Sequence, residues 1–340
     1  MGNSAASLPK VSIVIPTHYR PGLLRSLLDS LQAQVYPRDL LQVIVVTSPG
    51  DPGEEVVHSC IGHGFGELLA VSIPQDPQQG RNPAAKRNYG VLQATSSWVA
   101  FIDDDCIADP QWIGNAAPLL ADPAVVAVEG RKEIPRVDPP TLTYKGLLSF
   151  TRPRGFQTCN MFYRRDIFLQ AGGFDTRFLY YLEDSDLAWT ILDLGYAIPY
   201  ASGALVRHPV PEPAPWRLLD NARRTIFLPL LRRKHPLQYH RSGMRVLRAC
   251  HWMYLALYIG GFVGLACGWM GPAIGLLALL PGMVVLHSLK LFWRCRVRCQ
   301  EVLVTALLLP VVPPVRLIQY IRGNIRYGLK GQGVNTPRSP

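Results

Sequence analysis

The sequence predicts an α/β domain with a mostly parallel sheet, followed by helices that enter or cross a membrane. Two patterns lead to this fold class. Apolar strand-like runs alternate with helical patterns over the first two thirds of the chain, and residues 249–289 form a 41-residue stretch without Lys, Arg, Asp or Glu. Alternation of this kind is typical of βαβ units, whereas a long uncharged stretch is typical of membrane spans.

Four short apolar runs predict strands at residues 11–15, 41–46, 68–73 and 98–102. Leucines at helical spacing follow Pro21, and a second helix is predicted to begin near Pro83 and to continue past Ala94. Ligands of parallel sheets bind beyond the carboxyl ends of the strands. We therefore expect a site where residues 16–18 and 103–105 follow the first and fourth strands.

Charge is distributed unevenly along the chain. Residues 1–215 carry 17 basic and 22 acidic side chains, whereas residues 216–340 carry 18 basic side chains and only two acidic ones, Asp220 and Glu301. Basic side chains interleaved with apolar runs suit a membrane surface, so we expect no nucleic-acid partner. A basic soluble domain with a buried apolar core is the alternative, and it leaves the uncharged stretch unexplained.

The uncharged stretch is long enough for two spans, because a bilayer core needs roughly 20 helical residues. Gly271-Pro272 is predicted to supply the turn between them. Basic residues flank the stretch, namely Arg241, Arg245 and Arg248 before it and Lys290, Arg294, Arg296 and Arg298 after it. The positive-inside rule then places both ends in the cytoplasm. We expect localisation in the cell (inner) membrane with the α/β domain cytoplasmic, and a buried hairpin in a soluble protein is the alternative.

The segments beside the hairpin predict weaker membrane contacts. Residues 216–236 are apolar and basic and predict an amphipathic surface helix, and residues 302–315 contain three prolines, which favours an interfacial or re-entrant segment. The predicted division is 1–215 for the α/β domain, 216–248 for interface helices, 249–289 for the spans, 290–330 for the basic interfacial or re-entrant segment and 331–340 for a disordered tail.

Three consecutive carboxylates, Asp103-Asp104-Asp105, follow the fourth strand. They repel one another unless a cation lies among them, and oxygen ligands suit Mg²⁺ or Mn²⁺, which bridge to phosphate oxygens. Lys86 and Arg87 occur shortly before them, near a helix N-terminus, which favours a phosphate-bearing ligand. Taken alone, the aspartates could form a solvated acidic turn, and the basic residues could form a solvated helix face.

Two further motifs lie near the end of the α/β domain. Glu183-Asp184 opens a predicted helix, where the acids either complement the helix dipole or supply a general base for an incoming hydroxyl. His208 follows a short strand and is either a structural side chain or a neutral metal ligand.

In combination these motifs resemble the family-2 glycosyltransferases, inverting enzymes with the GT-A fold, over about residues 10–210. The similar segments are the first strand with its Pro-Thr ending at 11–17, the A-R-N-x-G helix at 83–90, the D-x-D motif at 103–105, the G-G-F-D turn at 172–175, the E-D-x-D-L motif at 183–187 and the G-Y at 195–196. Each motif alone is weak evidence for the family, whereas six motifs in the family's order and at roughly its spacing are strong evidence.

The resemblance implies a site for a nucleotide-diphosphate sugar and a divalent metal, Mg²⁺ or Mn²⁺. The metal is implied to bind Asp105, and His208 is a weaker match to a ligating histidine. Asp103 is implied to bind either the donor ribose or the metal. The diphosphate is implied to lie near Arg87 and Lys86.

The same resemblance implies contacts to the other parts of the substrates. Pro16 and Thr17 are implied to contact the nucleobase, and Asp104 to support the metal ligands or the donor. Asp184 is implied as the base that removes the acceptor's proton, with Glu183 beside it on the acceptor side.

Two positions depart from the family's pattern. The family usually ends its second strand with an Asp that contacts the base, whereas Thr47-Ser48 stands here, so a hydroxyl of Thr47 takes the place of a carboxylate. The Asn that usually follows Pro-Thr is replaced by His18-Tyr19-Arg20, and Arg20 is included among the donor-binding candidates.

The sequence therefore predicts a membrane-bound glycosyltransferase whose acceptor is a hydroxyl of a lipid-linked sugar or glycolipid. Transfer to polyprenyl phosphate or to a soluble acceptor is an alternative, and a non-catalytic nucleotide-sugar-binding scaffold is an alternative from another class. A processive synthase is disfavoured because residues 221–224 lack the Gln and Trp of the Q-x-x-R-W motif. The sequence leaves the sugar, the nucleotide, the lipid and the oligomeric state open.

Overall fold

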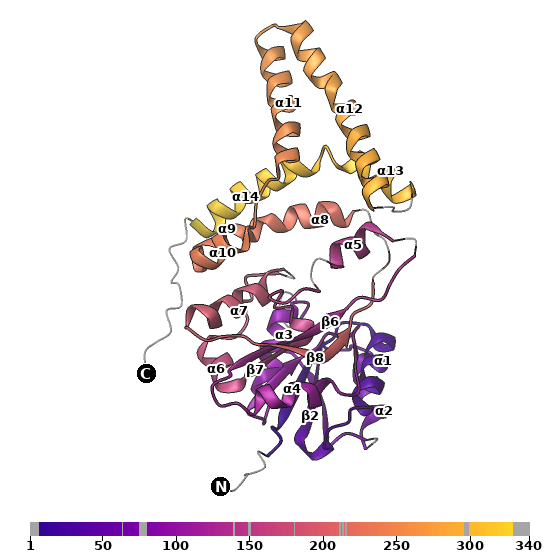
Figure 1. The fold of residues 1–340 in the computed structure, drawn as a ribbon, viewed down its shortest axis with the longest axis vertical. Coiled ribbons are helices and arrows are strands. Elements are labelled where there is room, and N and C mark those ends of the chain that lie inside the picture. Colours follow the sequence, from indigo (N-terminus) through magenta and orange to yellow (C-terminus); the bar gives the residue numbers. More distant parts are fainter. Residues whose placement is uncertain are drawn as a thin grey trace. The chain divides into compact units, whose positions relative to one another are not determined.

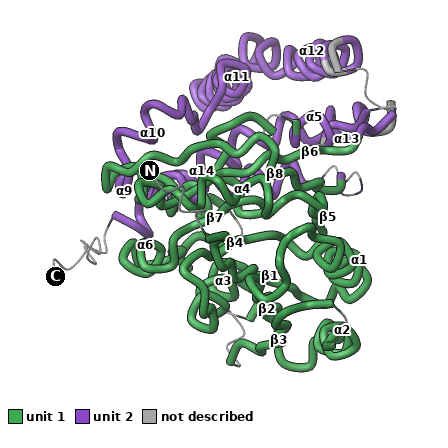
Figure 2. The backbone as a smooth tube through the Cα atoms, turned by 60° about the horizontal axis from the view of Figure 1, so that its bottom comes forward, with its two compact units in different colours: residues 1–135, 148–209, 335–340 green, residues 136–147, 210–334 purple. Residues whose placement is uncertain are grey.

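The structure is a computed structural model of the chain and describes residues 7–62, 64–74, 80–138, 140–148, 151–179, 181–210, 212, 214, 216–295 and 299–328. It contains two compact units (Figure 2). Unit 1 comprises residues 1–135, 148–209 and 335–340, and unit 2 comprises residues 136–147 and 210–334. The predicted tail at 331–340 lies outside the described residues.

Unit 1 alternates strands and helices from its first element. Its elements are β1 (Val11–Pro16), α1 (Pro21–Gln32), η1 (Arg38–Leu40), β2 (Leu41–Thr47), α2 (Gly53–Cys60), β3 (Glu67–Ser72), α3 (Pro83–Gln93), β4 (Trp98–Phe101), β5 (Ile107–Ala108), α4 (Trp112–Leu120), β6 (Ala127–Glu133), η2 (Thr158–Asn160), β7 (Met161–Arg164), α6 (Arg165–Gln170), α7 (Glu183–Asp193) and β8 (Tyr200–Arg207). The four predicted strands and the helices after Pro21 and at Pro83 are confirmed within one or two residues at each end.

The sheet of unit 1 (Figure 1) is mixed. Its strands lie in the order β3-β2-β1-β4-β7-β6-β8-β5. β3, β2, β1 and β4 are parallel to one another, as the βαβ pattern predicts. β7 is antiparallel to β4 and β6, β8 is parallel to β6, and β5 is antiparallel to β8. The parallel prediction therefore holds for the first four strands, and the later strands make the sheet mixed.

Helices cover both faces of the central strands, which explains why these strands are apolar along their whole length. Every residue of β1, β2 and β4 is buried. On one face, Ile13 and Val43 pack in a core with leucines of α1 and with Trp112 of α4. On the other face, α3 packs against β1 and β2. The register pairs Val14 with Phe101, so β1 and β4 end at the same edge of the sheet.

The described part of unit 2 is helical. Its elements are α5 (Leu142–Leu148), α8 (Arg217–Arg223), η3 (Arg224–Phe227), α9 (Leu228–Lys234), α10 (Pro236–Ser242), α11 (Ala249–Ala266), α12 (Met270–Cys295), α13 (Cys299–Leu308) and α14 (Val312–Gly328). α5 belongs mostly to unit 2, where the backbone N–H of Leu142 donates to Glu301 Oε2 at 2.8 Å.

Two helices of unit 2 are long and apolar enough to cross a membrane, namely α11 and residues 270–290 of α12. The predicted turn at Gly271-Pro272 is wrong. The chain turns at Gly268, which has φ +76°, and the N–H of Trp269 closes the helix end on the carbonyl of Gly264 at 2.8 Å. Pro272 instead lies in the first turn of α12, where helix N–H groups have no helical acceptor.

The segments beside the hairpin are more broken than the sequence predicts. Residues 217–234 are helical throughout, but the 3-10 segment η3 separates α8 from α9, and Pro229 stands in the first turn of α9. A 53° bend separates residues 301–308 of α13 from α14. Only when taken together are these two helices long and apolar enough to cross a membrane. Of the predicted flanking charges, Arg296 and Arg298 lie outside the described residues.

Gly90 provides a stability test of the packing between α3 and the sheet. A Cβ at Gly90 would lie 2.5 Å from Val14 Cγ1 and 2.9 Å from Val46 Cγ2. We expect Gly90→Ala to lower the free energy of unfolding by about 1–3 kcal/mol through overpacking. Gly22→Ala is the matched control, because a Cβ there meets nothing within 4 Å. Equal thermal midpoints for the two variants of the full-length protein in detergent would contradict this packing.

Candidate active site

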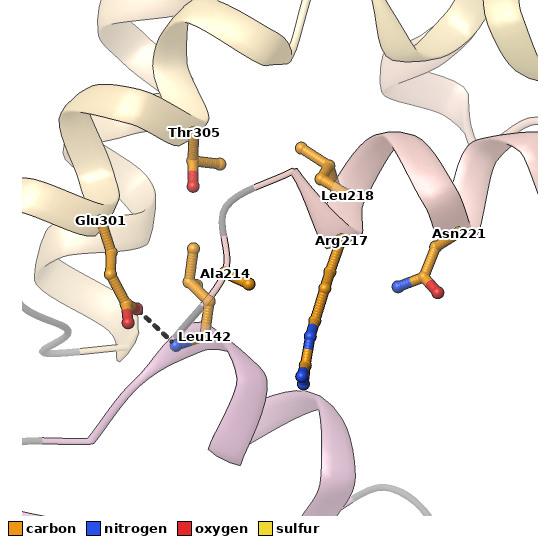
Figure 3. A pocket seen from close by; sticks show the side chains of 7 residues that line it. All are labelled: Leu142, Ala214, Arg217, Leu218, Asn221, Glu301 and Thr305. Atoms are coloured by element: carbon orange, nitrogen blue, oxygen red, sulfur yellow. Dashed lines mark hydrogen bonds between the residues drawn. The ribbon is translucent and has the colours of Figure 1, made fainter. Parts of the chain in front are cut away.

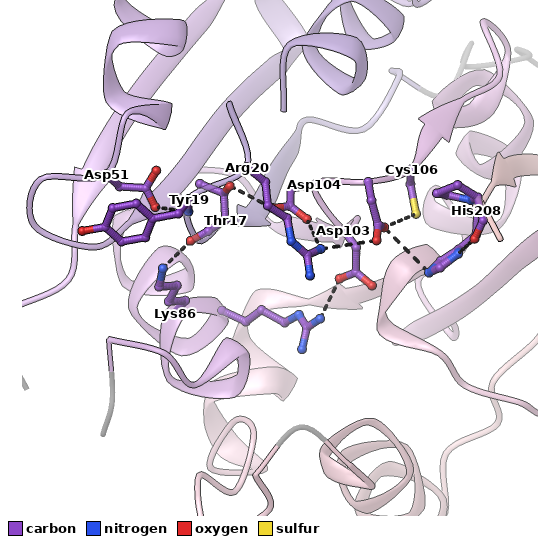
Figure 4. A network of polar contacts seen from close by, with 12 residues as sticks. Thr17, Tyr19, Arg20, Asp51, Lys86, Asp103, Asp104, Cys106 and His208 are labelled. Carbon is purple, nitrogen blue, oxygen red and sulfur yellow. Dashed lines mark hydrogen bonds and ion pairs between the residues drawn. The ribbon is translucent and has the colours of Figure 1, made fainter. Parts of the chain in front are cut away.

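Polar residues at the carboxyl ends of β1 and β4 meet in one cleft, as predicted (Figure 4). The cleft has a volume of about 240 Å³ and includes the first turn of α3. The predicted site residues that line it are Pro16, Thr17, Arg20, Lys86, Arg87, Asp103, Asp104 and Asp105. Thr47, Glu183, Asp184 and His208 are not among its lining residues.

Thr17 and Lys86 form the wall beneath the end of β1. Thr17 is buried and its hydroxyl donates to Asp104 Oδ2 at 2.8 Å. The Lys86 ammonium donates to the carbonyl oxygen of Thr17. Burial lowers the pKa of Lys86 to about 8, although the nearby Asp51 and Asp104 carboxylates oppose this shift. Lys86 is therefore a cation held in a partly dehydrated position, where its attraction for an anion is screened less than at the surface.

The three consecutive aspartates have different surroundings. Asp104 points into the protein, and burial raises its pKa to about 6, while the hydrogen bond from Thr17 and the charge of Arg20 lower it. Arg20 Nη1 lies 3.3 Å from Asp104 Oδ1 and 3.4 Å from Asp105 Oδ2. The Arg20 side chain is half exposed, so it is the cation of this group that is freest to move toward a ligand.

Arg87 connects two acidic motifs that are far apart in the sequence. Its Nη2 lies 2.6 Å from Asp103 Oδ1, and its Nη1 lies 3.3 Å from Glu183 Oε1. The Arg87 side chain is only 6% exposed and lies over the Phe174 ring, 5.7 Å from the centroid. Because both terminal nitrogens contact carboxylates, Arg87 lines the cleft as a link between acids rather than as a free phosphate ligand.

The acidic end of α7 begins in an uncommon backbone conformation. Leu182, the residue before the helix, has φ +74°, and Glu183 and Asp184 follow in the first turn. Asp184 Oδ1 accepts a hydrogen bond from the Ser185 N–H at 2.6 Å. Burial raises the pKa of Asp184 to about 7, with the charge of Glu183 adding to the shift and the hydrogen bond opposing it. A carboxyl that titrates near neutral pH suits a general base.

Asp105 and His208 offer a pair of metal-ligand atoms. Asp105 Oδ1 lies 3.7 Å from His208 Nε2, and His208 Nδ1 lies 2.8 Å from the Pro209 carbonyl oxygen. A carbonyl only accepts, so Nδ1 carries the proton and Nε2 of the neutral ring presents a lone pair toward Asp105. A separation of 3.7 Å is too long for a hydrogen bond. Neighbouring ligands of an octahedral Mg²⁺ lie about 3.0 Å apart, so the two side chains would have to move slightly closer together to bind one ion.

Cys106 completes a group of three potential ligand atoms within 4.8 Å of one another. Burial raises the pKa of its thiol well above the ordinary value, so the thiol stays protonated and contacts Asp105 Oδ1 at 3.7 Å. The donors left for an ion are the Asp105 carboxylate and the His208 imidazole, and the Asp103 carboxylate stands two residues before Asp105 in the sequence. This set fits a hard divalent cation better than a thiophilic one.

The structure does not bring Thr47 to the cleft. Its hydroxyl is buried and donates to Glu54 Oε1 at 2.7 Å, because β2 directs this side chain toward α2. Sequence reasoning missed Asp51, whose buried carboxylate accepts the N–H groups of Tyr19 at 2.8 Å and Gly53 at 2.9 Å. These bonds hold Tyr19 at φ +54° and so shape the loop after β1. The Pro-Gly-Asp turn after β2 was the signal that could have found it.

Residues 12–174 match the family model for glycosyl transferase family 2. The chain contains a family-2 glycosyltransferase domain. Relatives of this glycosyltransferase include AglE of Haloferax volcanii, with 26% identity over 60% of this chain and 68% of AglE. Another is the O-antigen chain rhamnosyltransferase RfbN of Salmonella typhimurium, with 27% identity over 58% of this chain and 66% of RfbN. The chain spans about half of YdaM of Bacillus subtilis, at 24% identity over 60% of this chain and 52% of YdaM.

Solved structures share the fold of this glycosyltransferase. The mannosyltransferase PcManGT of Pyrobaculum calidifontis, in complex with GDP-Man and Mn²⁺, aligns with a TM-score of 0.63 at 22% identity over 92% of this chain and 87% of its own. S. aureus TarS 1–349 with UDP-GlcNAc aligns with a TM-score of 0.51 at 16% identity over 94% and 92%. The GT-A fold of unit 1 is therefore confirmed. The family match ends at residue 174, so α7 and His208 lie beyond it.

The Arg87 link predicts a large loss of stability when it is removed. We expect Arg87→Met to lower the free energy of unfolding by about 3 kcal/mol, because the substitution leaves two carboxylates without their partner. The Asp103 side chain is 29% exposed, so water can solvate its carboxylate and limit the loss. Arg164→Met is the matched control, since its ion pair with Asp166 is on the surface and is worth less than about 1 kcal/mol. Equal losses in denaturant unfolding would refute the link.

Proposed function

We propose that this protein is a membrane-anchored, metal-dependent, inverting glycosyltransferase. It takes a sugar from a nucleotide-diphosphate sugar and passes it to a hydroxyl of a lipid-linked sugar or glycolipid at the cytoplasmic face of the cell (inner) membrane. The observation that carries the proposal is the link through Arg87, which joins the donor-side Asp103 to the acidic pair at the start of α7. One buried side chain thereby connects a place for the donor with a candidate base.

The cleft supports a donor that carries a diphosphate. Lys86 and Arg20 supply positive charge on its walls. Pro16 and Thr17 at the end of β1 offer a surface for the nucleobase. The solved neighbours that share the fold are complexes with GDP-Man or UDP-GlcNAc, which is in keeping with a donor of this class.

The metal site is proposed to consist of Asp105 and His208, with Asp103 as a further oxygen donor and Mg²⁺ or Mn²⁺ as the ion. When bound, such an ion neutralises charge on the leaving diphosphate. Asp104 holds Thr17 and Arg20 in place through its two oxygens. The proton on His208 Nδ1 fixes the ring so that Nε2 faces Asp105.

Asp184 is proposed to act as the general base, with Glu183 fixed beside it by Arg87. A hydroxyl acceptor is a weak nucleophile, so a positioned base accelerates its attack by roughly 10²–10⁴-fold. A polyprenyl phosphate is already anionic near neutral pH, because its second pKa is about 6, and needs no base. The raised pKa of Asp184 therefore favours a hydroxyl acceptor over polyprenyl phosphate.

The membrane side of the proposal rests on α11 and α12, which are long and apolar enough to span. A lipid-borne acceptor suits an enzyme that is anchored beside it, and one of the relatives is named as an O-antigen chain transferase. A non-catalytic nucleotide-sugar-binding scaffold is disfavoured, because such a protein has no use for a base beside its donor cleft.

Replacement of the base separates catalysis from folding. We expect Asp184→Asn to fold and bind donor but to lose transfer by at least about 10²-fold, because an amide keeps the contact to the Ser185 N–H and cannot take a proton. Wild-type transfer should rise with pH through about 7, where Asp184 ionises. The assay is transfer of radiolabelled sugar from UDP-, GDP- and dTDP-sugars to membrane lipid extracts. Near-normal transfer by the folded variant, or transfer to polyprenyl phosphate alone, would refute the proposal.

The orientation of the hairpin is open to a separate test. A reporter fused after Lys330 should be cytoplasmic, and a reporter inserted at Gly268 should be external, because basic residues flank the hairpin and its turn has none. Protease accessibility in sealed vesicles reads out both positions. A C-terminus found outside would mean that α13 and α14 together form a third span.

A further inference from the structure

A second pocket lies within unit 2 and is built from three of its helices (Figure 3). Its volume is about 130 Å³, and α5, α8 and α13 contribute its walls. Its lining residues are Leu142, Ala214, Arg217, Leu218, Asn221, Glu301 and Thr305. Nothing in the glycosyltransferase reaction described above uses this pocket.

Two pairs of polar side chains face this pocket from different helices. Arg217 and Asn221 extend from α8, and Glu301 and Thr305 extend from α13 (Figure 3). Residues four apart in a helix lie on the same face, so each pair forms a polar strip along one wall. One wall is rich in hydrogen-bond donors and carries a positive charge, and the other is rich in acceptors and carries a negative charge.

Glu301 is the observation that points to a ligand. Its side chain is 8% exposed, and Oε2 accepts the N–H of Leu142 at 2.8 Å. Its other oxygen, Oε1, is buried and has no hydrogen-bond partner among the described residues. A buried carboxylate oxygen without a partner destabilises the fold, and a ligand that donates a hydrogen bond to Oε1 removes that penalty.

Arg217 supplies the complementary requirement. Within the part of the chain that the structure describes, its guanidinium makes no ion pair with an acidic side chain, and Glu301 on the opposite wall is not within salt-bridge distance of it. A ligand that satisfies both walls carries an anionic group for Arg217 and, next to it, a hydroxyl that donates to Glu301.

The other helices of unit 2 indicate where such a ligand comes from. α11 and α12 are apolar enough to cross a membrane, and they expose large apolar side chains such as Trp252, Phe262 and Leu286. A unit embedded in a bilayer is surrounded by lipid phosphates at high local concentration. We propose that the pocket of unit 2 binds the phosphate headgroup of a membrane lipid that carries a free hydroxyl beside the phosphate.

The size of the pocket agrees with a headgroup rather than a whole lipid. Drug-sized ligands occupy pockets of roughly 300–1,000 Å³, whereas about 130 Å³ is present here. The apolar Leu142 and Leu218 in its lining contact the carbon atoms of the headgroup, and the acyl chains remain in the bilayer.

Two lipids that differ only in the hydroxyls test the proposal. Phosphatidylglycerol and phosphatidylethanol have the same single negative charge, and only the first has free hydroxyls. Full-length protein in detergent is offered equal amounts of both with identical acyl chains, and bound lipid is counted by native mass spectrometry. We expect the wild type to prefer phosphatidylglycerol by about tenfold to a hundredfold, which is the effect of one hydrogen bond to a charged group.

Variants assign the preference to the pocket. Glu301→Gln keeps a carbonyl oxygen for the Leu142 N–H but replaces the other carboxylate oxygen with an NH₂ donor. Thr305→Val removes a hydroxyl with little change in side-chain shape. Each substitution should abolish the preference for phosphatidylglycerol. Arg217→Met should weaken the binding of both lipids by a similar factor. Two control variants should bind both lipids as the wild type does. Asp220→Asn changes the only other acidic residue of residues 216–340, and Arg322→Gln changes an exposed side chain of α14.

Three outcomes would overturn the proposal. The first is equal binding of both lipids by the wild type, and the second is an unchanged preference in folded Glu301→Gln and Thr305→Val. The third is full displacement of the lipid by millimolar glycerol phosphate, which would make the pocket a site for a soluble phosphate. Because the readout is lipid binding, these outcomes do not depend on whether sugar transfer is observed.

Discussion

The ion pairs of Arg87 are the interaction on which the rest of the active site depends. The guanidinium is nearly inaccessible to water and contacts Asp103 after β4 and Glu183 at the start of α7. A buried guanidinium is tolerated only when its charge is balanced; here both terminal nitrogens contact carboxylates, whereas the buried Nε has no hydrogen-bond partner among the described residues. These demands fix the distance between the strand end that faces the donor and the helix end that holds the candidate base. The Phe174 ring under the guanidinium belongs to an aromatic cluster with Phe101 and Phe168.

Burial also sets the protonation behaviour of the cleft. The same loss of hydration that lowers the pKa of Lys86 to about 8 raises that of Asp104 to about 6 and that of Asp184 to about 7. A nucleotide diphosphate that enters the cleft adds negative charge, which favours the protonated, charged form of Lys86. The cleft is thus prepared for an anionic ligand, while Asp184, which does not line it, can titrate near neutral pH.

The parts of the fold that follow from local sequence could be predicted. β1, β2 and β4 are apolar throughout because helices cover both of their faces, and their polar ends identified the cleft. The Arg87–Glu183 contact joins residues 96 positions apart and depends on the left-handed backbone at Leu182, so no local pattern revealed it. Thr47 does not line the cleft, because β2 directs its hydroxyl toward Glu54, and the direction of a side chain is not visible in the local sequence. The turn at Gly268 was missed because the nearby Gly271-Pro272 gives a stronger turn signal.

A crystal structure of the full-length protein with Mn²⁺ and a nucleotide diphosphate, recorded at the manganese absorption edge, tests the account most directly. The account predicts one anomalous peak at bonding distance from Asp105 and from His208 Nε2, the diphosphate against Lys86, and Arg87 still between Asp103 and Glu183. An anomalous peak elsewhere, or an Arg87 side chain that leaves Glu183 to bind the diphosphate, would contradict it.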